Sequence, residues 1–340
     1  MNGPWCIGRR RRHRGDGAHG ARALVAVLAV ALMGGAQPPT TPEFEPSNGA
    51  TPMAVGWRQK PLHDRPAGVD LEISLDQQLY EVLLPLIQEY GRKHELHITV
   101  GQGTCGISSG LLARKELDVG GYCCPPGGVD RLPDLRFHTV AIAAIALVVH
   151  PDNPIRNLTL AQARAIYAGS IYRWEQLAED PAHAAWRGPI QPVGRLHCKQ
   201  RPGHWRLLLP DEDAFGPNLV EVGAIPDMIG VVARNRLAIG YETVWMVESN
   251  RDRGRVVPIS LDGVDPADLT ALVNRRYPLY RTYSITSWEG KAANPAVEPL
   301  VRHILDHSGK PATAFHMVGA EALHEAGWKF MDDELVGNGE

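Results

Sequence analysis

The ten residues from Val140 to Val149 carry only apolar side chains. A run of this kind predicts a strand that is buried on both faces, as in a parallel sheet with helices on each side. Residues 150–154, which include Pro151 and Pro154, follow directly and end the strand. The chain is therefore expected to build a sheet that is covered on both faces.

Short apolar segments alternate with segments of helical periodicity along most of the chain. Apolar residues recur at helical spacing from Leu79 to Tyr90. Ser74 and Gln77, which precede this segment, fit a capping box, and Pro85 within it removes one helical hydrogen bond. The expected strands are 97–100, 117–120, 140–149, 190–193, 238–241, 256–260 and 277–286, and the expected helices are 79–90, 107–112, 160–167, 222–232, 295–305 and 312–318. This alternation predicts an α/β fold with a parallel or mostly parallel sheet.

The first 36 residues have the pattern of a secretory signal peptide. They hold six arginines and one acid, Asp16, and the apolar run from Ala23 to Met33 is followed by small residues. Eleven residues reach only about 16 Å as a helix, against a bilayer core of ~30 Å, although an uncleaved membrane anchor is the alternative. Residues 37–64 are rich in Pro, Thr and Gly and are expected to form a flexible linker.

Export changes how the cysteines are interpreted. Cys6 would leave with the signal peptide, so Cys105, Cys123, Cys124 and Cys198 remain in a compartment that permits disulfides.

The formal net charge of −3 argues against a strongly basic nucleic-acid binder. The sequence holds none of the nucleophile-elbow, zinc-protease or phosphate-loop motifs, so we do not expect an enzyme.

Several segments, in order, resemble phosphate-type periplasmic solute-binding proteins, the extracytoplasmic components of ABC importers. The matching segments are 103–107, 117–120, 144–154, 158–174, 238–241, 263–266 and 277–281. The resemblance covers about residues 70 to 320.

The resemblance implies a type II periplasmic-binding-protein fold, in which two α/β lobes are joined by two crossover strands and enclose a ligand cleft. On that pattern, residues 65–150 and 255–330 form lobe one, residues 151–254 form lobe two, and residues 331–340 form a tail. Ligands of open α/β sheets lie beyond the carboxyl ends of the strands, where helix N-termini offer N–H groups to anions.

The resemblance also implies which loops line the cleft, and these loops depart from the family pattern. The family holds its anion with Ser and Thr hydroxyls and helix-start amides, often with an Arg and an Asp. Here Thr104, Asp118 and Arg195 keep such groups, whereas the Ser-Gly-Thr that should follow the Arg is missing.

All four remaining cysteines fall in those three loops. Thiolates are soft ligands that suit Cu(I), Zn(II) or a trivalent metalloid, and they are poor partners for phosphate. We therefore expect a cysteine-lined cleft that binds a small inorganic ligand, with a thiophilic metal or metalloid as the ligand and no other cofactor. The candidate ligand-binding residues are Thr104, Cys105, Asp118, Cys123, Cys124, Arg195, His197, Cys198, Lys199 and Arg201, and the four cysteines among them are the candidate metal ligands.

Two questions stay open at the level of the sequence. The cysteines can instead form disulfides that tie the loops together, which would leave a plain phosphate or oxyanion binder. The protein is expected to be a periplasmic monomer that delivers its ligand to a membrane permease; the alternative partner is a membrane sensor kinase.

Overall fold

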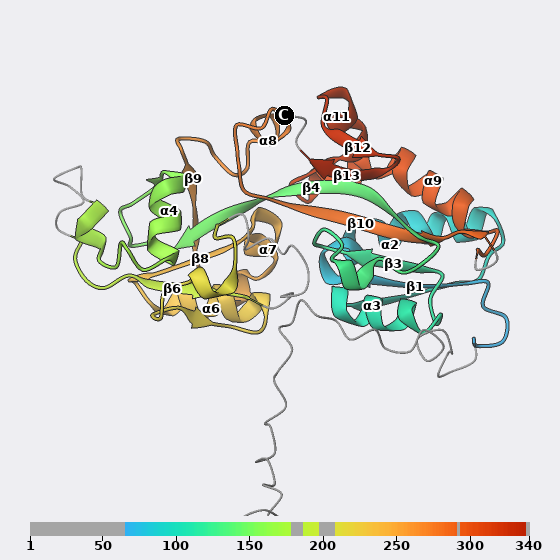
Figure 1. Cartoon of the computed structure of the whole chain (residues 1–340), viewed down its shortest axis with the longest axis horizontal. Coiled ribbons are helices and arrows are strands. Elements are labelled where there is room, and N and C mark those ends of the chain that lie inside the picture. The colour runs from blue at the N-terminus through green and yellow to red at the C-terminus, as the bar shows by residue number, and fades with distance from the viewer. Residues whose placement is uncertain (1–64, 178–185, 197–207, 291–292, 338–340) are drawn as a thin grey trace, which may run out of the picture. The chain divides into compact units, whose positions relative to one another are not determined.

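The computed structural model describes residues 65–177, 186–196, 208–290 and 293–337 (Figure 1). By internal contacts the chain divides into residues 1–46 and 47–340, and every described residue belongs to the second unit. The predicted signal peptide and linker lie outside the described residues. Among the described helices, none combines the length and the apolar character that a membrane crossing requires.

Lobe one is built on three parallel strands. Strand β1 (Leu71–Asp76) pairs in parallel with β2 (Ile98–Gly103) on one side and with β3 (Val119–Tyr122) on the other. Helix α2 (Gln77–Lys93) follows β1, and helix α3 (Cys105–Ala113) follows β2. Because the strands are parallel, the three loops that follow them emerge at one edge of the sheet.

Two long strands connect this sheet to the rest of the fold. Strand β4 (Leu135–Val149) contains the apolar run, which is buried throughout as the sequence predicts, although the strand begins at Leu135 rather than at Val140. It pairs antiparallel with β10 (Tyr280–Trp288) and β8 (Ala238–Thr243), and β10 also pairs antiparallel with β3 (Figure 1). The expectation of a mostly parallel sheet is therefore corrected. The sheet is mixed, since β4 and β10 run from one core to the other as crossover strands.

Lobe two packs around a second core, which includes Tyr167, Trp174 and Tyr241. Strand β6 (Gln191–Gly194) pairs in parallel with β8 and with β7 (Val220–Glu221). The other elements here are β5 (Asn157–Leu158), α4 (Leu160–Tyr167), α6 (Ile225–Arg234) and α7 (Val244–Ser249). Strand β9 (Val257–Leu261) and helix α8 (Leu269–Val273), which the resemblance assigns to lobe one, contribute Ile259, Leu261 and Leu272 to this second core. The structure also has 3₁₀ helices at Gly128–Asp130, Trp174–Leu177, Glu212–Ala214 and Arg251–Arg253.

The C-terminal segment returns to lobe one and ends in a hairpin. It contains α9 (Val297–His307), α10 (Gly309–Ala314), β11 (Met317–Gly319), α11 (Ala320–Glu325), β12 (Lys329–Met331) and β13 (Glu334–Gly337). The predicted helix over 312–318 is wrong beyond Ala314, because Met317–Gly319 pairs with β4. The residues assigned to a tail begin inside the β12–β13 hairpin. An ion pair of 2.6 Å between Arg131 and Glu334 fixes this hairpin to the fold.

The start of α2 differs from the sequence prediction in a way that matters for the site. Ser74 still lies in β1, and Asp76 is the N-cap, whose Oδ1 accepts a hydrogen bond from the Gln78 amide at 2.9 Å. Asp is as good an N-cap as Ser, and the strand simply continues two residues further than the capping-box pattern suggests. Pro85 lies inside the helix without ending it.

Candidate functional site

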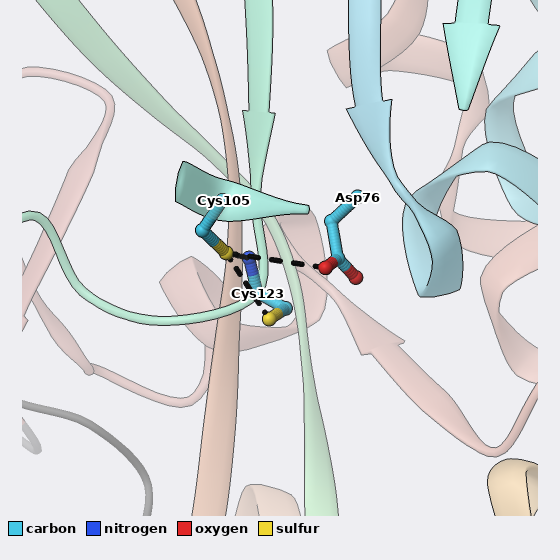
Figure 2. Close-up of side chains that lie close together, drawn as sticks. All are labelled: Asp76, Cys105 and Cys123. Atoms are coloured by element: carbon cyan, nitrogen blue, oxygen red, sulfur yellow. Dashed lines mark hydrogen bonds between the residues drawn. The ribbon is translucent and has the colours of Figure 1, made fainter. Parts of the chain in front are cut away.

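The carboxyl ends of the lobe-one strands bring two cysteines and an aspartate together. Asp76 is the last residue of β1, Cys105 is the first residue of α3 after β2, and Cys123 follows β3 directly. Figure 2 shows their side chains turned toward one another. We call these three residues the thiol cluster.

The thiol cluster is compact and shielded from solvent. The Sγ atoms of Cys105 and Cys123 lie 3.2 Å apart, and Cys105 Sγ lies 3.9 Å from Asp76 Oδ2. The Cys123 amide donates a hydrogen bond to Cys105 Sγ at 3.2 Å. One donor atom from each residue falls within 4.8 Å of the others, and the exposed fractions are 3%, 2% and 8% for Asp76, Cys105 and Cys123. Two sulfurs and one carboxylate oxygen at this spacing can serve as ligands to a single metal or metalloid.

Burial and mutual contact raise the pKa values of Asp76 and Cys105. Desolvation raises the pKa of Asp76 well above its ordinary value, and the proximity of Cys123 raises it further. The hydrogen bond with Cys123 is the main cause that raises the pKa of Cys105. The protonated forms of these two groups are therefore favoured.

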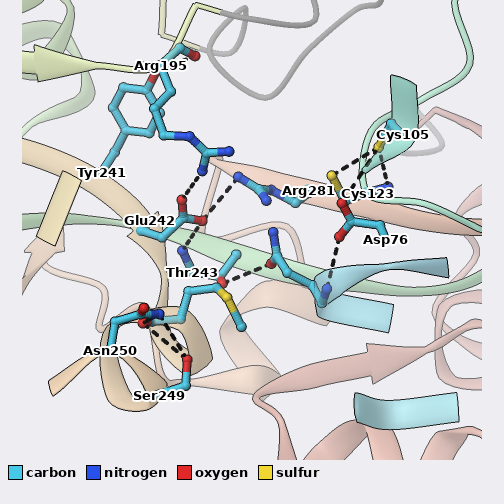
Figure 3. Close-up of polar contacts among 12 residues, drawn as sticks. Asp76, Cys105, Cys123, Arg195, Tyr241, Glu242, Thr243, Ser249, Asn250 and Arg281 are labelled. Carbon is cyan, nitrogen blue, oxygen red and sulfur yellow. Dashed lines mark hydrogen bonds and ion pairs between the residues drawn. The ribbon is translucent and has the colours of Figure 1, made fainter. Parts of the chain in front are cut away.

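A buried carboxylate with two arginines lies across from the thiol cluster (Figure 3). Glu242, at the end of β8, is fully buried; its Oε2 accepts from Arg195 Nη1 at 2.6 Å, and its Oε1 lies 3.1 Å from Arg281 Nη2. Arg195 follows β6, and Arg281 lies on β10. We call these three residues the Glu242 network.

Arg281 is the member of this network with hydrogen-bonding capacity to spare. Its side chain is 1% exposed, and its Nε, Nη1 and Nη2 atoms have no hydrogen-bond partner among the described residues. Its ion pair with Glu242 lacks hydrogen-bond geometry. Burial acts to lower the pKa of Arg281, but Glu242 and Cys123 raise it above its usual value, so the guanidinium stays charged. Figure 3 shows it between Glu242 and the thiol cluster.

A buried glutamine connects the two sets of residues. The amide oxygen of Gln78, at the start of α2, accepts hydrogen bonds from Thr243 Oγ1 at 3.2 Å and from the Tyr283 hydroxyl at 2.6 Å. Thr243 is the neighbour of Glu242 on β8, whereas Tyr283 lies on β10. The residues of lobe one are thus tied to the Glu242 network by direct polar contacts.

The structure places the remaining sequence candidates as follows. Thr104 caps α3, where its Oγ1 accepts from the Ile107 amide at 3.3 Å. Cys124 is fully buried and is not one of the three residues that could hold a single ion, but its side chain hydrogen-bonds to Cys105. Arg195 belongs to the Glu242 network. His197, Cys198, Lys199 and Arg201 lie outside the described residues, so their predicted roles stay predictions.

Asp118 is separated from the sulfurs, contrary to the sequence-based placement. It precedes β3 and therefore lies at the amino end of that strand, whereas Cys123 follows its carboxyl end. Its carboxylate forms an ion pair with Arg65 at 2.7 Å and accepts a hydrogen bond from the Glu72 amide at 2.8 Å. Asp118 thus anchors the edge of lobe one.

The disulfide alternative finds no support among the described cysteines. Cys105, Cys123 and Cys124 form no disulfide bond within the described part of the chain. Cys105 and Cys123 face each other as thiols, and any pairing with Cys198 lies outside the described residues, so that part of the alternative stays a prediction.

Sequence reasoning missed Asp76, Glu242 and Arg281. Each had a usable signal: Asp76 ends the first strand, Glu242 follows a predicted strand, and Arg281 lies in a segment that carries the family resemblance. Their importance comes from burial and mutual contact across lobes, which no local pattern reveals.

Comparison with known proteins agrees with this architecture. A family model described as a PBP superfamily domain matches residues 63–302. The chain belongs to this superfamily. Two curated relatives, both phosphate-binding protein PstS, from Pseudomonas aeruginosa strains PAO1 and UCBPP-PA14, are 26% identical over 175 residues. The match spans 49% of this chain and about half, 53%, of each relative.

Two solved structures share the fold. An ABC-type phosphate transport receptor from Vibrio cholerae matches with a TM-score of 0.57 and 21% identity, over 73% of this chain and 99% of that chain. A phosphate ABC transporter substrate-binding protein from Clostridium perfringens matches with a TM-score of 0.61 and 19% identity, over 73% of this chain and 98% of that chain. The predicted two-lobed periplasmic-binding-protein fold is confirmed.

Proposed function

We propose that this chain is a periplasmic solute-binding protein that captures a small inorganic, thiophilic ligand between its lobes and delivers it to an ABC importer. The observation that carries the proposal is the thiol cluster at the carboxyl ends of β1, β2 and β3, the position where open α/β sheets bind ligands. The relatives, phosphate-binding proteins and transport receptors by name, support the binding and transport role.

The chemistry of the residues favours a soft ligand over phosphate. A phosphate site needs strong donors, whereas Cys105 and Cys123 are weak donors with polarizable sulfur. Two sulfurs and Asp76 Oδ2 instead offer electron pairs to an electrophilic centre. The Glu242 network already lies across from that position, where lobe closure by a hinge motion would enclose the ligand (Figure 3).

A thermal-shift series on the full chain tests this proposal, with phosphate, sulfate, arsenite, Zn(II) and Cu(I) under a thiol-free reductant. A ligand that binds only the folded state at about 100 times its Kd stabilises by ~2.7 kcal/mol, which raises Tm by several degrees. We expect a shift with a thiophile that the Cys105→Ser/Cys123→Ser variant loses. A shift with phosphate alone, retained in that variant, overturns the soft-ligand proposal.

Phosphate is the second candidate ligand, because the named relatives bind it and because Arg195 and Arg281 supply two buried cations. The same titration separates the two ligands.

The membrane partner needs its own experiment. Affinity recovery from detergent-solubilised membranes, with and without ligand, is expected to yield a polytopic permease. Recovery of a sensor kinase instead would assign the chain to signalling.

A further inference from the structure

The fixed charges around the thiol cluster restrict what can enter it, given the proposed function. Arg195 and Arg281 supply two positive charges and Glu242 one negative charge, and none of these side chains is more than 7% exposed. This network therefore carries a net positive charge in a region of low dielectric. A hydrated metal cation would lose its water shell and approach that charge, whereas a neutral ligand avoids both penalties and an anionic ligand avoids the second.

The buried guanidinium of Arg281 also requires a hydrogen-bond acceptor. A fully buried guanidinium whose three nitrogens lack hydrogen-bond partners among the described residues is an unusual arrangement, because buried donors are nearly always satisfied. Figure 3 shows its side chain between Glu242 and the thiol cluster, so it lies beside Asp76 and Cys123. A ligand that bonds to sulfur and also carries an oxygen would satisfy both groups.

The separation of the two sulfurs favours a centre with a narrow bond angle. Two bonds of ~2.3 Å put the sulfurs ~4.6 Å apart in a linear centre, ~3.8 Å apart in a tetrahedral one and ~3.3 Å apart at a right angle. The observed Sγ–Sγ distance is 3.2 Å. A trivalent metalloid with a lone pair forms a trigonal pyramid with angles near a right angle, so it fits the thiols as they stand.

We infer that Cys105 and Cys123 chelate a trivalent metalloid hydroxide of the arsenite or antimonite class, whose remaining oxygen is held by Arg281. The neutral acid X(OH)₃ reacts with two thiols; two S–H and two X–O bonds break, two X–S and two O–H bonds form, and two molecules of water leave. The product (RS)₂X–OH is neutral, and no element changes oxidation state. Asp76 Oδ2, beside Cys105 Sγ, accepts a hydrogen bond from the X–OH group.

This assignment deepens the proposed function, and a matched pair of probes separates its failure from failure of that function. Arsenite and methylarsonous acid each form two As–S bonds, but the methyl compound carries a methyl group where the arsenite adduct carries oxygen. Replacement of Arg281 by Gln or Lys should weaken arsenite binding by about 10- to 100-fold, as loss of a charged hydrogen bond does. It should leave methylarsonous acid within about threefold of the parent chain.

X-ray absorption at arsenic gives an independent readout. We expect two sulfur neighbours and one oxygen neighbour in the parent chain, and loss of sulfur neighbours in Cys105→Ser and in Cys123→Ser. The control variant Arg302→Gln removes an exposed arginine of an α9 ion pair and should change neither affinity nor the neighbours of arsenic.

Three results would overturn the inference. Equal loss of both probes in the Arg281 variants removes the oxygen-holding role, provided that far-UV circular dichroism shows both variants folded. Thiol-dependent binding of Zn(II) or Cu(I), with no binding of arsenite, overturns the metalloid assignment and leaves the proposed function standing. Binding of phosphate alone overturns both.

Discussion

Neutralising Glu242 is expected to cost the protein a large part of its stability. Glu242 is fully buried and is the carboxylate that faces both Arg195, at 2.6 Å, and Arg281, at 3.1 Å. The change Glu242→Gln keeps the shape of the side chain, so it creates no cavity, but it leaves two buried guanidinium groups without an opposing charge. Breaking a buried ion pair from one side typically costs about 3–5 kcal/mol.

The expected loss lies near the lower end of that range. The side-chain amide oxygen that Glu242→Gln introduces can still accept a hydrogen bond from Arg195, so part of the contact survives. We therefore expect about 3 kcal/mol, and with a urea m value of about 3 kcal/mol/M for a chain of this size the midpoint falls by about 1 M.

Equilibrium urea unfolding followed by tryptophan fluorescence measures this shift directly. The matched control is Glu298→Gln, which removes the carboxylate of an exposed ion pair with Arg302, where 60% and 71% of the two side chains are accessible. Exposed pairs of this kind contribute at most a few tenths of a kcal/mol. If the two variants shift the midpoint equally, the Glu242 network is not the buried electrostatic centre that we describe.

Three further predictions concern the thiol cluster and its frame. Asp76→Asn should flatten the dependence of the unfolding free energy on pH above about pH 4. Burial raises the pKa of Asp76 in the folded chain, so the unfolded chain loses this proton at lower pH and the parent protein loses stability as pH rises. The Asn side chain cannot titrate but still caps the helix. Parallel urea titrations at pH 4 and pH 7 check this, and an unchanged slope contradicts it. Gly121→Ala should lower stability by about 1–3 kcal/mol and weaken ligand binding, because an added Cβ would lie 2.7 Å from Leu75 Cδ2, between β3 and β1. Gly128→Ala, which meets nothing within 4 Å, is its control, and a Gly121→Ala chain as stable as that control would refute the packing argument. Cys105→Ser should lower the free energy of unfolding, measured in urea, by less than about 1 kcal/mol while abolishing binding of thiophiles, and unfolding of that variant would assign the cysteine to core packing.

The fold was largely predictable from the sequence, because its strongest signals are local. The apolar run of β4 and the alternation of strands with helices depend on side-chain burial, and burial directly determines which positions along the chain are apolar. The capping residue of α2 and the end of α10 were not predictable with the same accuracy. Asp76 and Met317 take their roles from pairing with distant strands, and pairing overrides local propensity.

The candidate site was predictable only in part. The meeting of Cys105 with Cys123 follows from two loops that emerge at one edge of a parallel sheet, which a sequence can indicate. The roles of Asp76, Glu242 and Arg281 depend on contacts across lobes and on complete burial, and neither is encoded in spacing along the chain. Asp118 shows the converse, since a residue in a familiar motif lies at the wrong end of its strand to reach the sulfurs.

A crystal structure of the chain with its bound thiophile, phased on the anomalous signal of that element, tests the central claim most directly. We expect one strong anomalous peak about 2.3 Å from the Sγ atoms of both Cys105 and Cys123. A phosphate ion held between Arg195 and Arg281, with both sulfurs out of contact, would contradict the claim.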